Sequence, residues 1–316
     1  MHLGFAVQVL GRPQLKSHDS RRWQNSPHLS VSLAYLRDIL VYLQDVGIRL
    51  YRMHPDLAPY VTHPAFPQFH HQVAECAQEL AYLGQLARKA DIRLSFHTDP
   101  YTVLNSPDGD TAQQSLRKLT VLAEILEAME LGREAVVVTH VGGIFGDKNA
   151  SLEQFMRAYE HLPEQARSRL ALENDENRYS LPDIYRIHQL TGVRLVFDRL
   201  HFLLNNPQRM SVHEGLAMAL STWPSGVRPK MHFSSPRTEM KAVPTAEAEE
   251  EEAAESARSP LWSNHSDYIN PFEFIDFARL LGDSPAFDVM VEAKGKDLAV
   301  IRLRRDLARF APELVI

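Results

Sequence analysis

The stretch RLALENDENRYSLPDIYRIHQLTGVRLVFD (169–198) contains one complete strand–helix–strand unit. Two short apolar runs, 169–174 and 194–198, flank a longer amphipathic run at 181–191, which is the rhythm of parallel strands joined by a helix. The short runs are almost continuously apolar, as expected for strands that are covered on both faces. This stretch predicts an α/β fold with a parallel sheet.

The same unit recurs along the whole chain of 316 residues. Candidate strands lie at 2–9, 48–54, 92–97, 135–140, 169–174, 194–198, 229–234 and 287–293. Helices are expected near 28–46, 71–90, 111–131, 151–161, 181–191, 211–221, 271–282 and 297–309. Eight such units predict a single-domain TIM (β/α)8 barrel over residues 1–316. An open doubly wound sheet is the competing architecture, but no Gly-rich GxGxxG or Walker-type loop follows any strand.

Composition places the chain among soluble globular proteins, with 44% hydrophobic and 23% charged residues. No apolar run approaches the ~18 residues of a membrane span, and the start does not resemble a signal peptide. We therefore expect a prokaryotic cytoplasmic protein that is associated with the nucleoid when it acts. Cys76 is the only cysteine, so an intrachain disulfide and a thiolate metal cage are both excluded.

The segment 239–262 is acidic and low in complexity, and it interrupts the seventh strand–helix connection. Between Glu239 and Arg258 seven glutamates stand against Lys241 and Arg258, a local charge of −5 out of the total of −6. With few large apolar residues the segment cannot offset its ordering entropy by burial, so we expect a disordered loop insertion. A regulatory acidic segment is the alternative. The rest of the chain is nearly neutral, which neither supports nor excludes a DNA partner.

Histidines and carboxylates stand at or just after the ends of most predicted strands. They are His54, His97, His140, Glu173, Asp198 with His201, His232 and Glu292. In a TIM barrel these ends converge on one mouth, where such groups would repel one another and shift each other's pKa values. Divalent cations resolve the conflict, and mixed nitrogen and oxygen donors suit Mn²⁺, Zn²⁺ or Fe²⁺.

So many ligands imply two or three ions, and the carboxylates of Glu173 and Glu292 can bridge them. Ions spaced ~3.5–4 Å apart are the arrangement for phosphodiester hydrolysis. Sugar isomerases also hold metals in a barrel mouth, so the positions of the ligands leave both reaction classes open.

Eight short motifs carry a resemblance to a known family. They are THPAFP (62–67), LSFH (94–97), VLNSPD (103–108), THVGG (139–143), ALENDE (171–176), VFDRLHF (196–202), RPKMH (228–232) and VEAKGK (291–296). Together, and in this order, they resemble the UV damage endonuclease family, which is related in fold to endonuclease IV. The resemblance implies a metal-dependent hydrolase that nicks DNA 5′ to UV photoproducts, with abasic sites as a further substrate.

The resemblance also implies a set of site residues. Its metal ligands fall on His63, His97, His140, Glu173, Asp198, His201, His232, His265 and Glu292. Glu173, Lys230 and Glu292 take catalytic positions, and Lys230 matches a lysine that family members can carry as a carbamate. A phosphate contact from protonated Lys230 is the alternative. The implied cofactors are two or three divalent ions, Mn²⁺ first and Zn²⁺, Co²⁺ or Fe²⁺ otherwise, and the implied enzyme is a monomer.

The residues that read damage depart from the family pattern. Family members probe the duplex with a Gln–aromatic pair after the third strand, where this chain has Pro100 and Tyr101. After the first strand, Phe5 matches an aromatic, but Gln8 stands near the place of an Asn. Tyr101 and Phe5 can stack on bases, and Pro100 can wedge between base steps.

Several cations near the mouth are candidates for phosphate contacts. They are Lys148, Arg199 and Lys294, with Arg178 and Lys296 as weaker candidates. His54 matches no family ligand and is expected beside the metals or the DNA. Two other classes remain: a xylose-isomerase-like sugar isomerase or epimerase, and a non-catalytic binder of DNA lesions.

Overall fold

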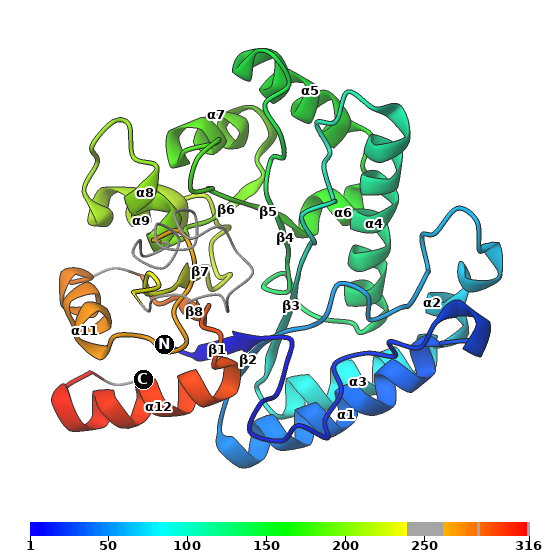
Figure 1. Ribbon diagram of the computed structural model, residues 1–316, viewed down its shortest axis with the longest axis horizontal. Helices are drawn as coiled ribbons and strands as arrows, with labels where there is room; N and C mark the ends of the chain where they lie inside the picture. Colours follow the sequence, from blue (N-terminus) through cyan, green and yellow to red (C-terminus); the bar gives the residue numbers. More distant parts are fainter. Residues whose placement is uncertain (239–261, 283–284, 315–316) are drawn as a thin grey trace, which may run out of the picture.

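In the computed structural model, eight parallel strands surround a common centre and helices cover them from outside (Figure 1). The structure describes residues 1–238, 262–282 and 285–314. The strands are β1 Leu3–Ala6, β2 Leu50–Arg52, β3 Arg93–His97, β4 Val137–Thr139, β5 Leu170–Glu173, β6 Arg194–Val196, β7 Lys230–Phe233 and β8 Asp288–Val291. Their order in the sheet is β6-β5-β4-β3-β2-β1-β8-β7. Between β6 and β7 a bridge pairs Asp198 with His232 and closes the ring. The predicted TIM barrel is confirmed.

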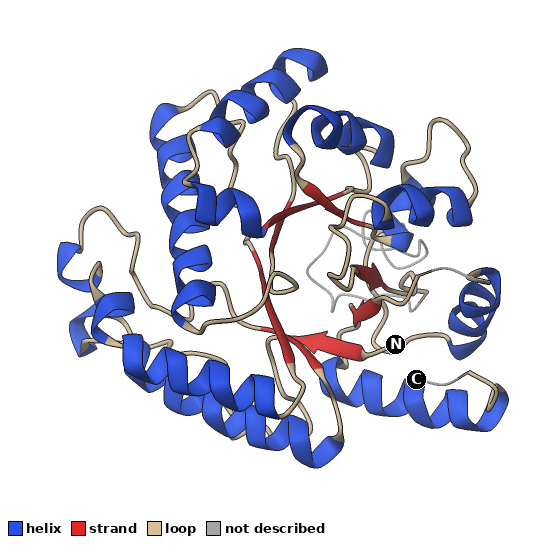
Figure 2. Ribbon diagram, turned by 180° about the vertical axis from the view of Figure 1, so that it is seen from behind, coloured by secondary structure: helices blue, strands red, loops and turns tan. Residues whose placement is uncertain are grey.

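The helices form the outer layer of the barrel (Figure 2). They are α1 Leu29–Val46, α2 Gln72–Glu75, α3 Ala77–Lys89, α4 Gly109–Ala128, α5 Lys148–Glu160, α6 Glu164–Arg169, α7 Leu181–Thr191, α8 Arg199–Leu204, α9 Val212–Leu220, α11 Pro271–Leu280 and α12 Lys296–Phe310, with short 3₁₀ turns η1 Trp23–Asn25 and η2 Pro67–Phe69. The helix expected at 71–90 is two helices that meet at Cys76. The helices α6 and α8 were not predicted, because six residues are too few to show a helical period.

Alternation along β3 shows how the strands build a polar interior. Arg93, Ser95 and His97 point into the barrel, while the leucine and phenylalanine between them pack in the main core under the helices. Nη1 of Arg93 lies 3.0 Å from Oδ2 of Asp288, and Nζ of Lys230 donates to Oγ of Ser95 at 3.1 Å. Each successive inward residue therefore lies one layer closer to the mouth, which is formed by the C-terminal ends of the strands.

The opposite end, the floor of the barrel, is filled by charged and aromatic side chains. The ring of Trp223 contacts two guanidinium groups, with its centre 5.5 Å from Cζ of Arg93 and 5.2 Å from Cζ of Arg194. Its Nε1 donates to the carbonyl oxygen of Leu195 at 2.7 Å. Because this packing fills the floor, the inward polar residues further along the strands face the mouth.

Two expectations concern the rest of the chain. The acidic insertion predicted at 239–262 lies outside the described residues except for Trp262. Among the described helices, none combines the length and the apolar character that a membrane crossing requires.

Candidate metal centre

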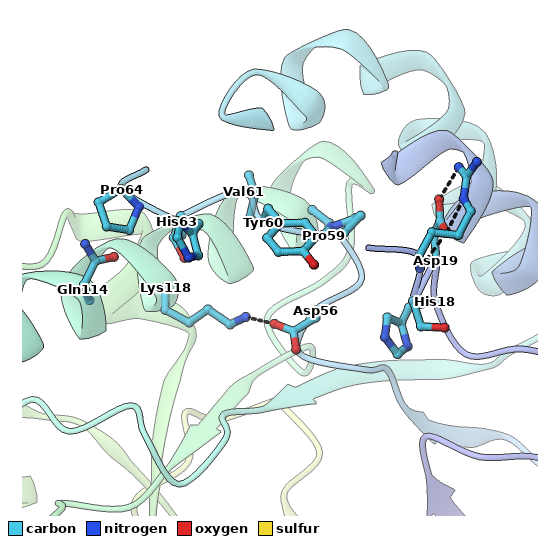
Figure 3. A pocket seen from close by; sticks show the side chains of 14 residues that line it. His18, Asp19, Asp56, Pro59, Tyr60, Val61, His63, Pro64, Gln114 and Lys118 are labelled. Carbon is cyan, nitrogen blue, oxygen red and sulfur yellow. Dashed lines mark hydrogen bonds and ion pairs between the residues drawn. The ribbon is translucent and has the colours of Figure 1, made fainter. Parts of the chain in front are cut away.

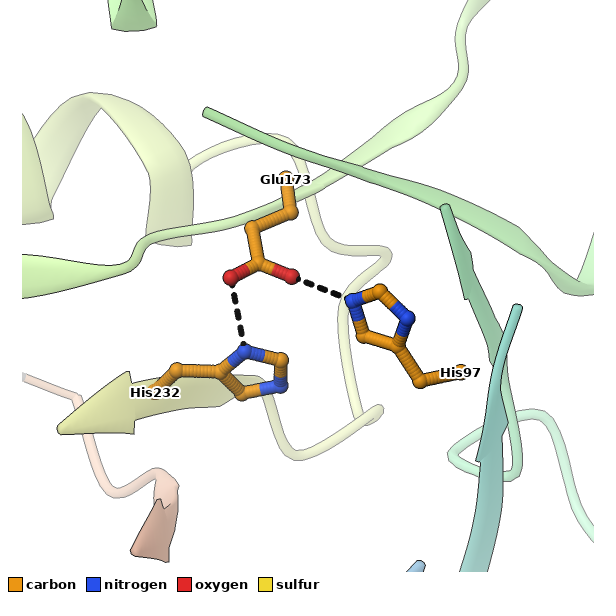
Figure 4. A group of neighbouring side chains, drawn as sticks. All are labelled: His97, Glu173 and His232. Atoms are coloured by element: carbon orange, nitrogen blue, oxygen red, sulfur yellow. Dashed lines mark hydrogen bonds and ion pairs between the residues drawn. The ribbon is translucent and has the colours of Figure 1, made fainter. Parts of the chain in front are cut away.

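Glu173, the last residue of β5, lies at the centre of a cluster in the barrel mouth. Its Oε2 lies 2.7 Å from Nε2 of His97, and its Oε1 lies 3.0 Å from Nδ1 of His232 (Figure 4). Nε2 of His140 is 3.8 Å from Oε2, and Nδ1 of His201 is 3.5 Å from Oε1. Four histidines, from β3, the residue after β4, α8 and β7, thus surround one buried carboxylate.

Two further carboxylates, Asp198 and Glu292, extend the cluster. Asp198 is fully buried, and one of its oxygens caps the first turn of α8. Oε1 of Glu292 lies 3.3 Å from Nδ1 of His232 and pairs with the guanidinium of Arg52. Nδ1 of His265 lies 3.7 Å from Oε2 of Glu292, at the edge of the cluster. The mouth therefore holds eight of the nine predicted ligands.

The donor atoms of this cluster fit bound cations in spacing and in type. Nitrogen and oxygen atoms lie within 4.8 Å of one another in two groups: His97, Glu173 and His232; and Glu173, Asp198, His232 and Glu292. Oδ2 of Asp198 and Nε2 of His232 are buried without a hydrogen-bond partner among the described residues. Leaving such an atom unpaired costs ~1–3 kcal/mol, and a coordinated cation would satisfy it.

The hydrogen bonds of His97 point to the same conclusion. Its Nδ1 lies 2.8 Å from the carbonyl oxygen of Thr98, which can only accept, so Nδ1 carries a hydrogen. In a neutral ring, Nε2 then presents a lone pair to the carboxylate of Glu173, and two acceptors cannot share a hydrogen bond. A second proton on the ring or a cation is needed there. Metal-binding histidines are commonly oriented by such a carbonyl.

Charge within the cluster keeps two of its carboxylates ionised. Burial raises the pKa of Glu173, but the imidazoles of His232 and His140 outweigh this and hold the pKa well below its usual value. Burial also raises the pKa of Glu292, and Arg52 outweighs it, so the net pKa is again lowered. The anionic form is the one that binds cations.

Lys230 lies deeper in the barrel, fully buried on β7. Burial, and then the positive charges of Arg93 and Arg52, lower its pKa well below the usual value. These effects favour the neutral form of its amine, which lies beside Ser95. This burial disfavours the alternative of a direct phosphate contact by a protonated Lys230.

Comparison with known proteins decides the family. A family model described as UV-endonuclease UvdE matches residues 20–313 of this chain. The chain belongs to the UV-endonuclease family. The resemblance drawn from the sequence motifs is thereby confirmed.

Curated members of the UV-endonuclease family align along most of the chain. The UV DNA damage endonuclease of Bacillus velezensis is 31% identical over 295 residues, which cover 92% of this chain and 85% of that protein. The UV DNA damage endonuclease of Bacillus pumilus is 30% identical, over 83% of this chain and 75% of that protein.

Solved structures share the fold. The crystal structure of SacUVDE has a TM-score of 0.79 at 23% identity and covers 98% of both chains. A D-psicose 3-epimerase from Clostridium cellulolyticum has a TM-score of 0.53 at 13% identity and covers 98% of this chain and 92% of that one. At these identities the likeness concerns the fold alone.

One ligand expected from the family, His63, lies outside the cluster. It is exposed and lines a separate pocket with Asp56 and Lys118 (Figure 3). Its ring stacks on that of Phe66, with 4.4 Å between centroids. His54 also lies apart from the cluster, where its ring stacks on that of His18, with 3.7 Å between centroids.

The predicted base-contacting residues of the UV-endonuclease family differ in exposure. Tyr101 is 87% exposed, and Pro100 and Gln8 are also exposed. Phe5 is fully buried and packs edge-on against Tyr51, with 5.4 Å between centroids. The structure corrects the expectation for Phe5. Its neighbours on β1 face into the barrel, and by strand alternation Phe5 points the other way, into the core under the helices.

The residues predicted to contact phosphates differ in exposure and in whether another group already contacts their charge. Nζ of Lys148 lies 2.6 Å from Oδ2 of Asp183, and the guanidinium of Arg199 lies 5.0 Å from the centre of the Phe233 ring. Lys294 is exposed in a pocket that also includes Lys296, Arg52, His265 and Glu292. Arg178 is exposed in a cleft beside His97 and His140.

Arg52 is a site residue that the sequence analysis missed. It is the last residue of β2 and shares the inward face with Leu50, so the alternation of this strand could have placed it in the mouth.

Proposed function

We propose that this chain is a metal-dependent endonuclease that nicks damaged double-stranded DNA 5′ to UV photoproducts and at abasic sites, and that it acts as a monomer. The convergence of buried carboxylates and imidazoles around Glu173, with donor atoms left unpaired, supports this proposal. Membership of the UV-endonuclease family and relatives named UV DNA damage endonuclease support the reaction class.

The cluster supplies ligands for two or three divalent cations, for which Mn²⁺ is the first choice. When bound, such cations would supply Lewis-acid stabilisation of the charge that develops on the phosphodiester. Glu173 and Glu292, with two oxygens each, would hold these cations together with the imidazoles. Arg52 fixes Glu292 by an ion pair, and the carbonyl of Thr98 orients His97.

Lys230 would add a further oxygen ligand if its amine carried a carbamate. A neutral amine is the form that reacts with carbon dioxide, and burial favours that form here. His63 would join the ligands only by a movement of the loop that carries it, because it now lines a different pocket.

The DNA side of the proposal uses residues that the structure leaves exposed. Tyr101, Pro100 and Gln8 would contact bases at the rim, and Arg178 and Lys294 would contact phosphates. The lesion would then lie over the cluster of carboxylates and imidazoles.

A nicking assay on three end-labelled duplexes tests the proposal. One duplex carries a single cyclobutane dimer, one an abasic site and one no damage, each incubated with the protein and Mn²⁺. We expect cuts 5′ to the dimer and at the abasic site, and no cut in undamaged DNA. If metal binds but none of the duplexes is cut, the proposal fails and the sugar isomerase or epimerase class takes its place.

A further inference from the structure

A cleft beside the metal cluster is lined by the loops that follow β3, β4 and β5. Its volume is about 530 Å³, within the range of ligand pockets, roughly 300–1,000 Å³. Two rings of the cluster around Glu173, those of His97 and His140, also line the cleft. A molecule that occupies the cleft therefore lies beside the cluster. Pro100 comes from the first loop, Phe145 from the second and Arg178 from the third.

Phe145 is a large apolar residue that remains 41% exposed in this cleft. Its ring folds back over Gly143, where a Cβ would lie only 2.6 Å from Cζ of the ring. The backbone of the loop is fixed: Nδ2 of Asn105 and the hydroxyl of Tyr179 both donate to the carbonyl oxygen of Gly143 at 2.7 Å. The amide of Phe145 donates to Oγ of Ser151 at 2.9 Å. The backbone that carries the ring is therefore held in place before any ligand binds, which lowers the entropy cost of a contact.

The charges in the cleft indicate which part of DNA it suits. Asp99, Asp175 and Glu176 line it, and their carboxylates disfavour a phosphate in the interior. Arg178 is exposed, and its guanidinium is in no ion pair with the residues that the structure describes. A neutral base inside the cleft, with its phosphate near Arg178, satisfies both conditions.

We propose that Phe145 is a further base-contacting residue, whose ring stacks on a DNA base held in this cleft, which Pro100 also lines. This inference rests on the proposed function. Pro100 has neither a donor nor an acceptor in its side chain, so it cannot fix a base by hydrogen bonds. Phe145 supplies the aromatic wall of this cleft. Since every base has a π face, the contact holds purines and pyrimidines alike.

Three substitutions separate the ring from the bulk of the side chain. Phe145→Ala removes both, Phe145→Leu keeps apolar bulk without a π system, and Phe145→Tyr keeps the ring. The first two should raise the KM for nicking of the dimer-containing duplex about 10-fold with little change in kcat, as expected for loss of one base stack. Phe145→Tyr should restore the wild-type KM.

A direct readout of stacking accompanies the kinetics. With 2-aminopurine next to the lesion, mixing with the wild type should quench its emission, and Phe145→Leu should lose that quenching. Phe310→Ala is the matched control, since Phe310 is 42% exposed at the end of α12, where the helix has returned to the floor side of the barrel. It should leave KM and quenching unchanged.

The outcomes distinguish this inference from the proposed function. If wild-type protein nicks the duplex and Phe145→Leu matches it in both KM and quenching, the role of Phe145 is overturned while the endonuclease assignment stands. If wild-type protein neither binds nor nicks a damaged duplex, the proposed function fails first. Should Phe145→Ala unfold, Phe145→Leu and Phe145→Tyr still decide the question.

Discussion

Nε2 of His97 lies 2.7 Å from Oε2 of Glu173. In a neutral ring the hydrogen is on Nδ1, which donates to the carbonyl oxygen of Thr98, so Nε2 has none for this contact. The two residues end strands β3 and β5 and are 76 positions apart in the sequence. Their approach needs a second proton or a cation. Glu173 contacts His232 as well, so its carboxylate joins two rings of the cluster.

Replacement of Glu173 by Gln should abolish nicking. The amide keeps the size of the side chain but offers one acceptor oxygen instead of two. We expect the rate to fall more than about 100-fold, because mutation of an outer partner of a metal ligand alone costs ~10–100-fold. DNA binding should remain largely intact. Glu153→Gln, at an exposed position on α5, is the control, and near-normal nicking by the Glu173 variant would contradict the account.

Removal of Arg52 should weaken metal binding without removing a ligand. Its guanidinium pairs with Glu292 and helps to hold that carboxylate ionised, so Arg52→Met should reduce metal affinity about 10–100-fold. Arg52→Lys, which keeps the charge, should recover part of the loss. Isothermal titration with Mn²⁺ measures this, and unchanged affinity in Arg52→Met would show that the pair is incidental.

Metal binding should stabilise the folded chain. A ligand at 100 times its Kd adds ~2.7 kcal/mol to the free energy of unfolding, so the Tm should rise when Mn²⁺ is added to chelator-treated protein. The double variant His97→Ala, His232→Ala should lose most of this rise. A Tm that responds equally in wild type and variant would place the metal elsewhere.

His54 should make stability depend on pH. Burial, and then the neighbouring charge of His18, lower the pKa of His54 to about 4, against 6.5 for an unperturbed histidine. Between these values the unfolded chain binds a proton that the folded chain does not, so stability falls as the pH is lowered from 6.5 towards 4.

Urea unfolding at several pH values measures this effect. His54→Gln should show a shallower decline in the free energy of unfolding than the wild type. His161→Gln, at the exposed end of α5, is the control. A decline that is equally steep in His54→Gln would assign the pH dependence to other groups.

Arg93 should be a main contributor to the stability of the floor. Its ion pair with Asp288 is buried, and removal of one partner leaves an uncompensated buried charge, at a cost of ~3–5 kcal/mol. The exposed pair of Arg49 with Asp91 is the matched control, and Arg49→Ala should cost ~0–1 kcal/mol. Similar losses for Arg93→Ala and Arg49→Ala in chemical denaturation would contradict the role of the floor.

The barrel and most of the cluster could be predicted from the sequence because both follow from local periodicity. Strand ends in a parallel barrel converge, so the sequence alone predicts that His97, Glu173 and His232 lie together. Loop positions do not follow this rule. The loop after β2 carries His63 into a different pocket.

The direction of individual side chains was also predicted less well than the fold. Phe5 matched an aromatic of the family, but strand alternation turns it towards the helices, where it is fully buried. Arg52 alternates towards the mouth and was overlooked. The sequence does not distinguish Phe145 from a core residue. In the structure Phe145 is exposed, and its ring lies over Gly143.

The most direct test of the central claim is the nicking of a dimer-containing duplex by metal-free protein to which Mn²⁺ is added back in steps. We expect no nicking without metal, and a cut 5′ to the dimer that appears as Mn²⁺ is bound. Nicking that persists in chelator, or Mn²⁺ binding without any cut at the dimer, would contradict it.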